Sequence, residues 1–223
     1  MDIKIPKIVG LLATMVLLLS ACGLVYVRGS GNLISEPRSV SDFDRVSLSG
    51  SGEVIITQSG EESLIVETDD NVMEYVTTSV RGGTLYLGFE AKKARAVSPS
   101  RLSFSLDVKD LVGLKISGSG SVDSASIDTD RLEVEVSGSG DVRIDSLTAD
   151  EVDVRISGSG NVELAGEAAE QDVTISGSGD ATVWAIDSLD ARISGSGSVK
   201  YYGRPTTNLS GSGSGKFSSL DEK

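Results

Sequence analysis

The stretch LEVEVSGSGDVRID, residues 132–145, decides the fold, because it places SGSG between two runs of alternating apolar and charged residues. SGSG by itself is typical of a flexible linker, yet the same four letters recur in a similar setting along the chain. The copies begin at Ser49, Ser117, Ser137, Ser157, Ser176, Ser194 and Ser210. Successive copies are 68, 20, 20, 19, 18 and 16 residues apart. A period near 20 residues indicates a repeat architecture.

The residues around each copy alternate with period two, which is typical of a strand with one buried face. Within residues 132–144, every second residue is aliphatic or glycine, and the alternation continues through the motif. Both glycines therefore fall on the inward set and both serines on the outward set. This pattern predicts a sharp corner, in which the inside has no room for a Cβ atom and the serines face water.

A unit of about 20 residues cannot bury its apolar side alone, whereas stacked units form a continuous core. The sequence therefore predicts an all-β fold, a parallel β-solenoid (β-helix) of six or seven short coils with SGSG in one column. A β-sandwich of hairpins is the alternative, since short strands with frequent turn signals also suit it. The recurrence of glycine in one column favours the solenoid.

Two parts of the chain depart from the repeat. Residues 63–89, SLIVETDDNVMEYVTTSVRGGTLYLGF, predict extra strands with a turn near residues 70–75 and a hairpin at RGG, which would cap the first end of the stack. Residues 208–217, NLSGSGSGKF, predict a shortened terminal repeat. Residues 29–42 have little periodicity and predict a tether.

The N-terminus has the three parts of a secretory signal, namely Lys4 and Lys7, an apolar run from Ile8 to Leu19, and small residues before Cys22. LSAC, residues 19–22, resembles the bacterial lipobox. That resemblance implies that Cys22 is lipidated and becomes the first residue of the mature chain, with several acyl chains giving a stable anchor. An uncleaved helical anchor is the alternative. Both predict an extracytoplasmic protein at the membrane, in the outer membrane if the cell is Gram-negative, since Gly23 is not Asp.

Composition narrows the function classes. The formal net charge is −13, from 20 basic and 33 acidic residues, which argues against nucleic acid as a partner. The chain has no His and one Cys, so the usual general base and a Cys-based zinc site are missing. A carboxylate-based, polysaccharide-active β-helix enzyme stays open as an alternative, because carboxylate pairs work without His. No cofactor is predicted.

FDRVSLSGSGEVIITQ, residues 43–58, followed by residues 63–89 and repeated ISGSGDV-type units, resembles a bacterial family of unknown function. The family is titled putative auto-transporter adhesin, head GIN domain. The resemblance covers residues 43–217 and implies a secreted or lipid-anchored β-solenoid. It provides no catalytic residues.

Two candidate sites follow from the columns. Asp141, Asn161 and Asp180 directly follow the motif and form a weak calcium alternative, since calcium prefers several oxygen ligands. A hydrogen-bonded polar ladder is the simpler interpretation. Trp184 and Tyr202 each lie five residues after the last glycine of their motif, so they would stack on one outward column. Neighbouring aromatic side chains can bind a sugar face or a protein, or they can merely pack on each other.

These observations predict a signal peptide at residues 1–21, a lipid-anchored tether at 22–42, a solenoid domain at 43–217 and a tail at 218–223. The predicted function is a non-catalytic binding or scaffolding module of the cell envelope. Its partners would be the membrane, through the lipid, and a glycan or an envelope protein. A purely structural envelope protein is the remaining alternative.

Overall fold

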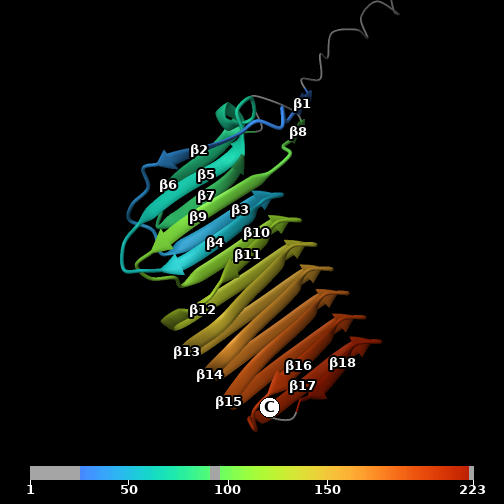
Figure 1. The fold of residues 1–223 in the computed structure, drawn as a ribbon. Coiled ribbons are helices and arrows are strands. Elements are labelled where there is room, and N and C mark those ends of the chain that lie inside the picture. The colour runs from blue at the N-terminus through green and yellow to red at the C-terminus, as the bar shows by residue number, and fades with distance from the viewer. Residues whose placement is uncertain (1–25, 91–95, 221–223) are drawn as a thin grey trace, which may run out of the picture.

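The computed structural model describes residues 26–90 and 96–220, and these are almost entirely β-strand (Figure 1). The predicted signal peptide and Cys22 lie outside the described residues. The strands before the main repeat are β1 (Tyr26–Arg28), β2 (Leu33–Arg38), β3 (Arg45–Gly50), β4 (Glu53–Gln58), β5 (Ser63–Asp69), β6 (Val76–Arg81), β7 (Thr84–Phe89), β8 (Ala96–Ser98) and β9 (Leu102–Val108). The remaining strands are β10 (Gly113–Gly118), β11 (Ser121–Ser124), β12 (Ile127–Gly138), β13 (Asp141–Gly158), β14 (Asn161–Gly177), β15 (Asp180–Gly195), β16 (Ser198–Tyr202), β17 (Thr206–Gly213) and β18 (Lys216–Ser219). A 3₁₀ turn, η1, spans Met73–Tyr75.

Each coil has two strand segments that meet at SGSG, and the same segments of successive coils pair in parallel. We call the segments before the corner the leading face, which contains β3, β10, β17 and the C-terminal parts of β12–β15. The segments after the corner form the trailing face, which contains β4, β11, β16, β18 and the N-terminal parts of β13–β15. This parallel stacking confirms the predicted β-solenoid and excludes the sandwich of antiparallel hairpins.

The two glycines of the corner are needed for different reasons. The second one faces the core, where a Cβ at Gly140 would lie 2.6 Å from Cγ2 of Ile116 in the preceding coil. The first one has a positive φ, 134° at Gly158, and a Cβ there would overlap the carbonyl oxygen of Gly138 in the preceding coil. That carbonyl also accepts a hydrogen bond from the amide of Ser159 at 2.8 Å. The corner is therefore a tight turn held coil to coil.

The last coil corrects the predicted register. Ser194 pairs with Ser212 and Gly195 with Gly213, so the final corner begins at Ser212 and not at Ser210. In both registers the glycines face inward and the serines face outward, because SGSGSG repeats every two residues. The observed register places Phe217 beside Val199 on an inward column, where its ring covers the end of the core.

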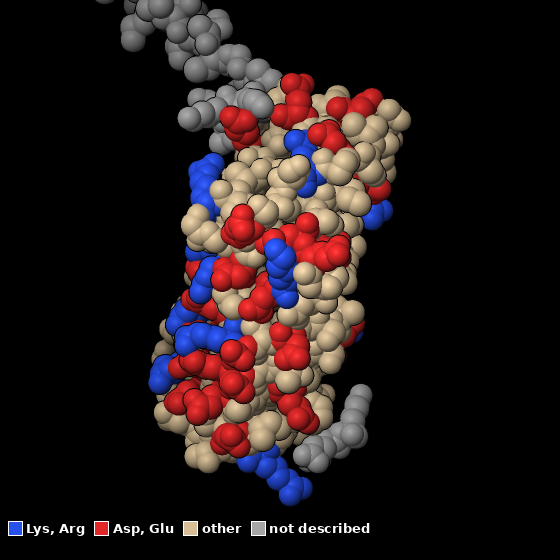
Figure 2. All heavy atoms as spheres, turned by 90° about the vertical axis from the view of Figure 1, so that its left-hand side faces the viewer, with Lys and Arg blue, Asp and Glu red and all other residues tan. Residues whose placement is uncertain are grey.

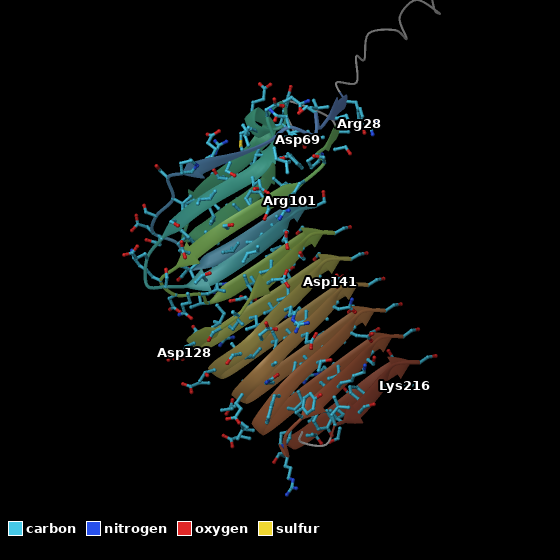
Figure 3. All side chains as sticks on the ribbon, viewed as in Figure 1. Arg28, Asp69, Arg101, Asp128, Asp141 and Lys216 are labelled. Carbon is cyan, nitrogen blue, oxygen red and sulfur yellow. The ribbon has the colours of Figure 1, made fainter. Side chains whose placement is uncertain are left out.

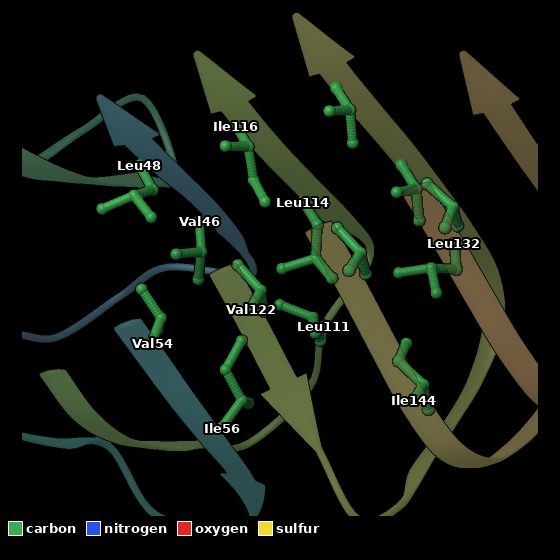
Figure 4. Close-up of a cluster of buried hydrophobic side chains, with 14 of the residues drawn as sticks. Val46, Leu48, Val54, Ile56, Leu111, Leu114, Ile116, Val122, Leu132 and Ile144 are labelled. Carbon is green, nitrogen blue, oxygen red and sulfur yellow. The ribbon is translucent and has the colours of Figure 1, made fainter. Parts of the chain in front are cut away.

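The core is one continuous cluster of mainly aliphatic side chains along the stack, and Figure 4 shows part of it between the leading and trailing faces. Residues such as Ile116, Val136 and Ile156 stand in one column and are at most 2% exposed. Burial of one such side chain contributes about 1.5–3 kcal/mol. The period-two pattern of the sequence therefore becomes a continuous apolar interior.

The segment between the first two copies caps the stack, as predicted. β7 pairs in parallel with β3 and β9 pairs in parallel with β4, so both lie beyond the first coil. Outside them, β6 pairs antiparallel with β7, and β5 pairs antiparallel with β9. The chain thus leaves the first coil, builds the cap, and returns to add β10 on the other side of β3.

Much of the predicted tether is folded, which corrects the expectation for residues 29–42. β2 pairs antiparallel with β5 at the edge of the cap, and β1 pairs in parallel with β8. The weak alternation of β2 arises because most of its side chains are exposed on an edge strand. Both strands lie at the cap end of the stack, opposite β18 (Figure 1).

Candidate functional site

Trp184 and Tyr202 form an aromatic pair on the trailing face, near the open end of the stack. They are register partners in β15 and β16, so they occupy one column in adjacent coils, as predicted. Their ring centroids are 5.7 Å apart and the ring planes are inclined by 37°. Both side chains are half-buried, which leaves part of each ring accessible to a ligand.

A hollow of about 330 Å³ lies beside this pair, lined by Trp184, Ile186, Gly203, Arg204 and Glu167. Ile186 is 43% exposed, so it adds an apolar wall to the aromatic one. Gly203 has a φ of 90°, and a Cβ there would overlap the carbonyl oxygen of Ala185. A side chain at this position would also crowd Trp184, since the Cβ would lie 3.3 Å from Cδ1 of the indole.

A buried amide supports the aromatic pair from inside. Gln171 is 4% exposed and occupies a column that holds Leu189 in the next coil. Its Nε2 donates to the carbonyl oxygen of Trp184 at 2.6 Å, in the region where the β14–β15 ladder is irregular. Its Oε1 has no hydrogen-bond partner among the described residues. Gln171 therefore ties the backbone of Trp184 to the core.

The column after the corner is a hydrogen-bonded ladder. Asp141 Oδ1 accepts from the amide of Asn161 at 3.1 Å and from its Nδ2 at 2.8 Å. Asp180 Oδ1 accepts from the amide of Ser198 at 2.8 Å and also from the hydroxyl of Ser198. These donors occupy oxygens that the calcium alternative would use. Within residues 26–90 and 96–220, no group of three His, Cys, Asp or Glu side chains is arranged to hold a metal ion.

Charged side chains on the leading face form ion pairs between coils. Glu133 accepts from Arg45 and from Arg155, each at 3.0 Å, and the bond from Arg45 is the main reason that the pKa of Glu133 is lowered. Asp153 is 8% exposed, and this burial raises its pKa despite the ion pair with Arg155 at 2.5 Å. Figure 2 shows the same mixing of acidic and basic side chains on the side of the stack that it presents.

A second hollow, of about 150 Å³, lies on the leading face beside Tyr86. It exists because Gly113 stands in the column that holds Glu133 in the next coil, so one long side chain is missing. Tyr86 is 41% exposed, and the guanidinium carbon of Arg81 lies 5.9 Å from the centre of its ring. Lys115 lines the opposite wall. Sequence reasoning missed this hollow, although an alignment of the polar columns would have shown the glycine.

The cap end holds a cluster of carboxylates with many donors, labelled at Asp69 in Figure 3. Asp69 is fully buried and accepts from the amide of Gly31 at 2.6 Å and from the amide and hydroxyl of Ser100 at 2.7 and 2.6 Å. Asp70 accepts from Nδ2 of Asn32 at 2.9 Å. These bonds, led by the Ser100 hydroxyl and by Asn32 respectively, lower the pKa of both carboxyl groups. They clamp residues 28–32 onto the cap.

We expect the protein to lose stability when the pH falls below about 4, the ordinary pKa of these carboxyl groups in an unfolded chain. A group with a lowered folded-state pKa stabilises the fold above its unfolded pKa, and this contribution is lost as the pH falls through the folded value. Such carboxyl groups are Glu62, Asp69, Asp70 and Glu133. Thermal melts between pH 7 and pH 3 measure the effect.

Asp69→Asn should lower the melting temperature at neutral pH and reduce its further decrease on acidification. Asp153→Asn is the control, because the raised pKa of Asp153 contributes with the opposite sign. It should leave the decrease below about pH 4 in place. An unchanged acid response in Asp69→Asn would mean that the clamp does not contribute to stability in this way.

The fold and this surface define a class of protein, a capped parallel β-solenoid whose outer columns are regular and whose hollows are shallow. The described residues contain no helix that is long and apolar enough to span a membrane. Asp141 and Asp180 accept hydrogen bonds from the next coil, Asp69 and Asp70 accept them within the cap, and Glu133 and Asp153 pair with arginine side chains.

The chain belongs to the family described as "Putative auto-transporter adhesin, head GIN domain", which matches residues 42–181 and 168–205. This confirms the resemblance seen in the sequence. A search of curated proteins finds no match.

Solved structures share the fold over most of the chain. A "putative adhesin" from Bacteroides fragilis has a TM-score of 0.69 and 26% identity, and covers 87% of this chain and 100% of its own. A "putative lipid binding protein" from Parabacteroides distasonis has a TM-score of 0.65 and 26% identity, with coverage of 87% and 99%. A "putative adhesin" from Parabacteroides merdae, at 20% identity and a TM-score of 0.61 with coverage of 87% and 99%, shows the fold alone.

Proposed function

We propose that this chain is a non-catalytic binding module of the cell envelope, anchored through Cys22, that holds a glycan against Trp184 and Tyr202. The observation that supports this most directly is the inclined aromatic pair beside a hollow of about 330 Å³. Sugar rings present flat faces of C–H groups, which pack well on accessible aromatic rings. Glu167 and Arg204 at the same hollow supply an acceptor and a donor for sugar hydroxyl groups.

The rigidity of the scaffold supports the same function. Trp184 is held by its strand pairing with Tyr202 and by the bond from Gln171, so its ring is positioned before a ligand arrives. A site that is already ordered loses little conformational entropy on binding. The adhesin-like family and the absence of a deep cleft in the described hollows agree with binding rather than catalysis.

A glycan array and a pull-down from cell-wall material test the proposal. The chain from Gly23 to Lys223 suits both, because every strand of the described residues lies between Tyr26 and Ser219. We expect specific retention that Trp184→Ala/Tyr202→Ala weakens by roughly tenfold or more, since buried aromatic contacts dominate such interfaces. Intrinsic fluorescence provides a second measurement, because Trp184 is the only tryptophan and its emission should shift when a ligand covers it.

Tyr86→Ala is the matched control, since it removes an accessible aromatic ring from the other hollow. It should leave glycan retention unchanged. Absence of any retained glycan, or equal retention by the double variant, would contradict the proposal. Retention of lipid vesicles instead would favour the ligand class named for the Parabacteroides distasonis neighbour, and hydrolysis of a retained glycan would favour an enzyme.

A further inference from the structure

The C-terminal end of the stack presents unpaired strand edges. Among the described residues, β17 pairs only with β15 and β18 pairs only with β16. Every residue of β17, Thr206–Gly213, is exposed. Each strand therefore has one free row of backbone amides and carbonyls, which is a template for another strand.

The opposite end of the stack is protected. Its outermost strands are β2 and β6, which pair antiparallel with the strands inside them. β2 contains Pro37, flanked by Glu36 and Arg38, and proline and charged side chains on an edge strand hinder the addition of a further strand. β6 ends in the charged residue Arg81, whereas β17 contains neither proline nor a charged residue.

Charge also sets the C-terminal end apart. The chain contains 33 acidic residues, yet residues 206–219, which form β17, β18 and their corner, contain none. The only charged side chain there is Lys216, which Figure 3 shows at the far end of the stack. Two copies of an acidic protein repel each other over most of their surfaces, so strands without carboxylates, such as β17 and β18, are where their described residues can approach.

Two inward-facing residues of β17, Leu209 and Gly211, differ from those of the coil before it. Leu209 is 36% exposed although it continues a core column, being the register partner of Ala191. Gly211 takes the position of Ile193 in the preceding coil, and the ring of Phe217 lies beside it, with 3.5 Å between Cε2 of Phe217 and a Cβ built at Gly211. An exposed leucine and a glycine flanked by an aromatic ring therefore stand two residues apart on the inward side of one free strand.

We propose that this end binds a second copy of the same chain, through antiparallel pairing of the two β17 strands about a two-fold axis near Ser210. This register places Leu209 opposite the partner's Gly211 and the reverse, so each leucine packs over a glycine, beside the Phe217 ring of the other copy. It also keeps inward residues inward on both sides. The contact is isologous, so it closes at two copies and leaves no further edge of β17 free.

The pair would have its two caps, and hence the two Tyr26 residues, at opposite ends. If each chain is anchored by the segment before Tyr26, the two C-terminal ends would meet in the middle, and each cap would point toward the anchor of its own chain. This contact is separate from the proposed glycan site and does not rest on it.

Sedimentation equilibrium of the chain from Gly23 to Lys223, from low to high micromolar concentration, tests the proposal. We expect the average mass to rise from one copy to two and to stop there. Leu209→Lys should weaken the association by roughly tenfold or more, because it places an inward charge on the paired edge. Ser210→Glu and Ser210→Lys should each weaken it by roughly fivefold, since like charges then stand opposite each other.

A mixture of Ser210→Glu with Ser210→Lys should associate more tightly than either variant alone, which a contact elsewhere on the surface would not produce. Ser105→Glu is the matched control, because Ser105 is an exposed serine on β9, far from this end. A single-copy mass at all concentrations would overturn the proposal. So would growth beyond two copies, or dimers that the β17 variants do not weaken. Circular dichroism of each variant confirms that it is folded.

Discussion

Gly158→Ala should destabilise the protein by about 2–6 kcal/mol, which combines a positive-φ strain of about 1–3 kcal/mol with a packing clash of about 1–3 kcal/mol. The strain arises because φ at Gly158 is 134°, which L-residues rarely adopt. The clash arises because the new Cβ would overlap the carbonyl oxygen of Gly138. That oxygen cannot move freely, since it also accepts the hydrogen bond from Ser159.

The chain contains a control that separates the two causes. Gly50 stands in the same column and has a φ of 94°, but a Cβ there would have no heavy atom within 4 Å. Gly50→Ala should therefore carry only the strain, about 1–3 kcal/mol. Urea denaturation followed by circular dichroism compares the two variants. Equal losses would show that coil-to-coil contact is not what requires glycine at this corner.

Phe104→Ala should cost about 3–5 kcal/mol, the usual range for removal of a fully buried phenylalanine. Phe104 has no exposed surface and lies in β9, where it covers the first coil from the cap side. Its ring also approaches Gly52 of the first corner, with 3.4 Å between Cε2 and a Cβ built there. The cavity would therefore form where the cap meets the stack.

Phe217→Ala is the matched change at the other end, where the ring is only partly buried against the core. We expect the free energy of unfolding to fall by about 1–2 kcal/mol, because folding removes less of the Phe217 ring from water at the open end of the stack. Urea denaturation of the two variants at low protein concentration measures the difference. A loss at Phe217 as large as that at Phe104 would mean that the terminal coil is as firmly packed as the cap.

Several features of the candidate site were predictable from the sequence. Trp184 and Tyr202 follow their corners by the same number of residues, and stacked coils convert equal offsets into one column. The ladder at Asp141 and Asn161 follows for the same reason. The hollows were missed: an alignment of the polar columns shows Gly113, but the shape of both hollows depends on side chains of neighbouring coils. The glycan, the lipid at Cys22 and the calcium alternative stay untested predictions.

The sequence by itself determined the coil, because period-two alternation and the SGSG corner are local properties that occur in each repeat. Tertiary structure decided the features for which the local pattern allows more than one answer. SGSGSG fits the corner at Ser210 and at Ser212 equally well, and only the pairing of Gly195 with Gly213 and the burial of Phe217 select the second. Likewise β2 has little alternation of its own, and it is a strand because β5 offers it a free edge. Periodicity fixes which side chains face inward, whereas hydrogen bonding between distant segments fixes where each strand stops and which edges stay open.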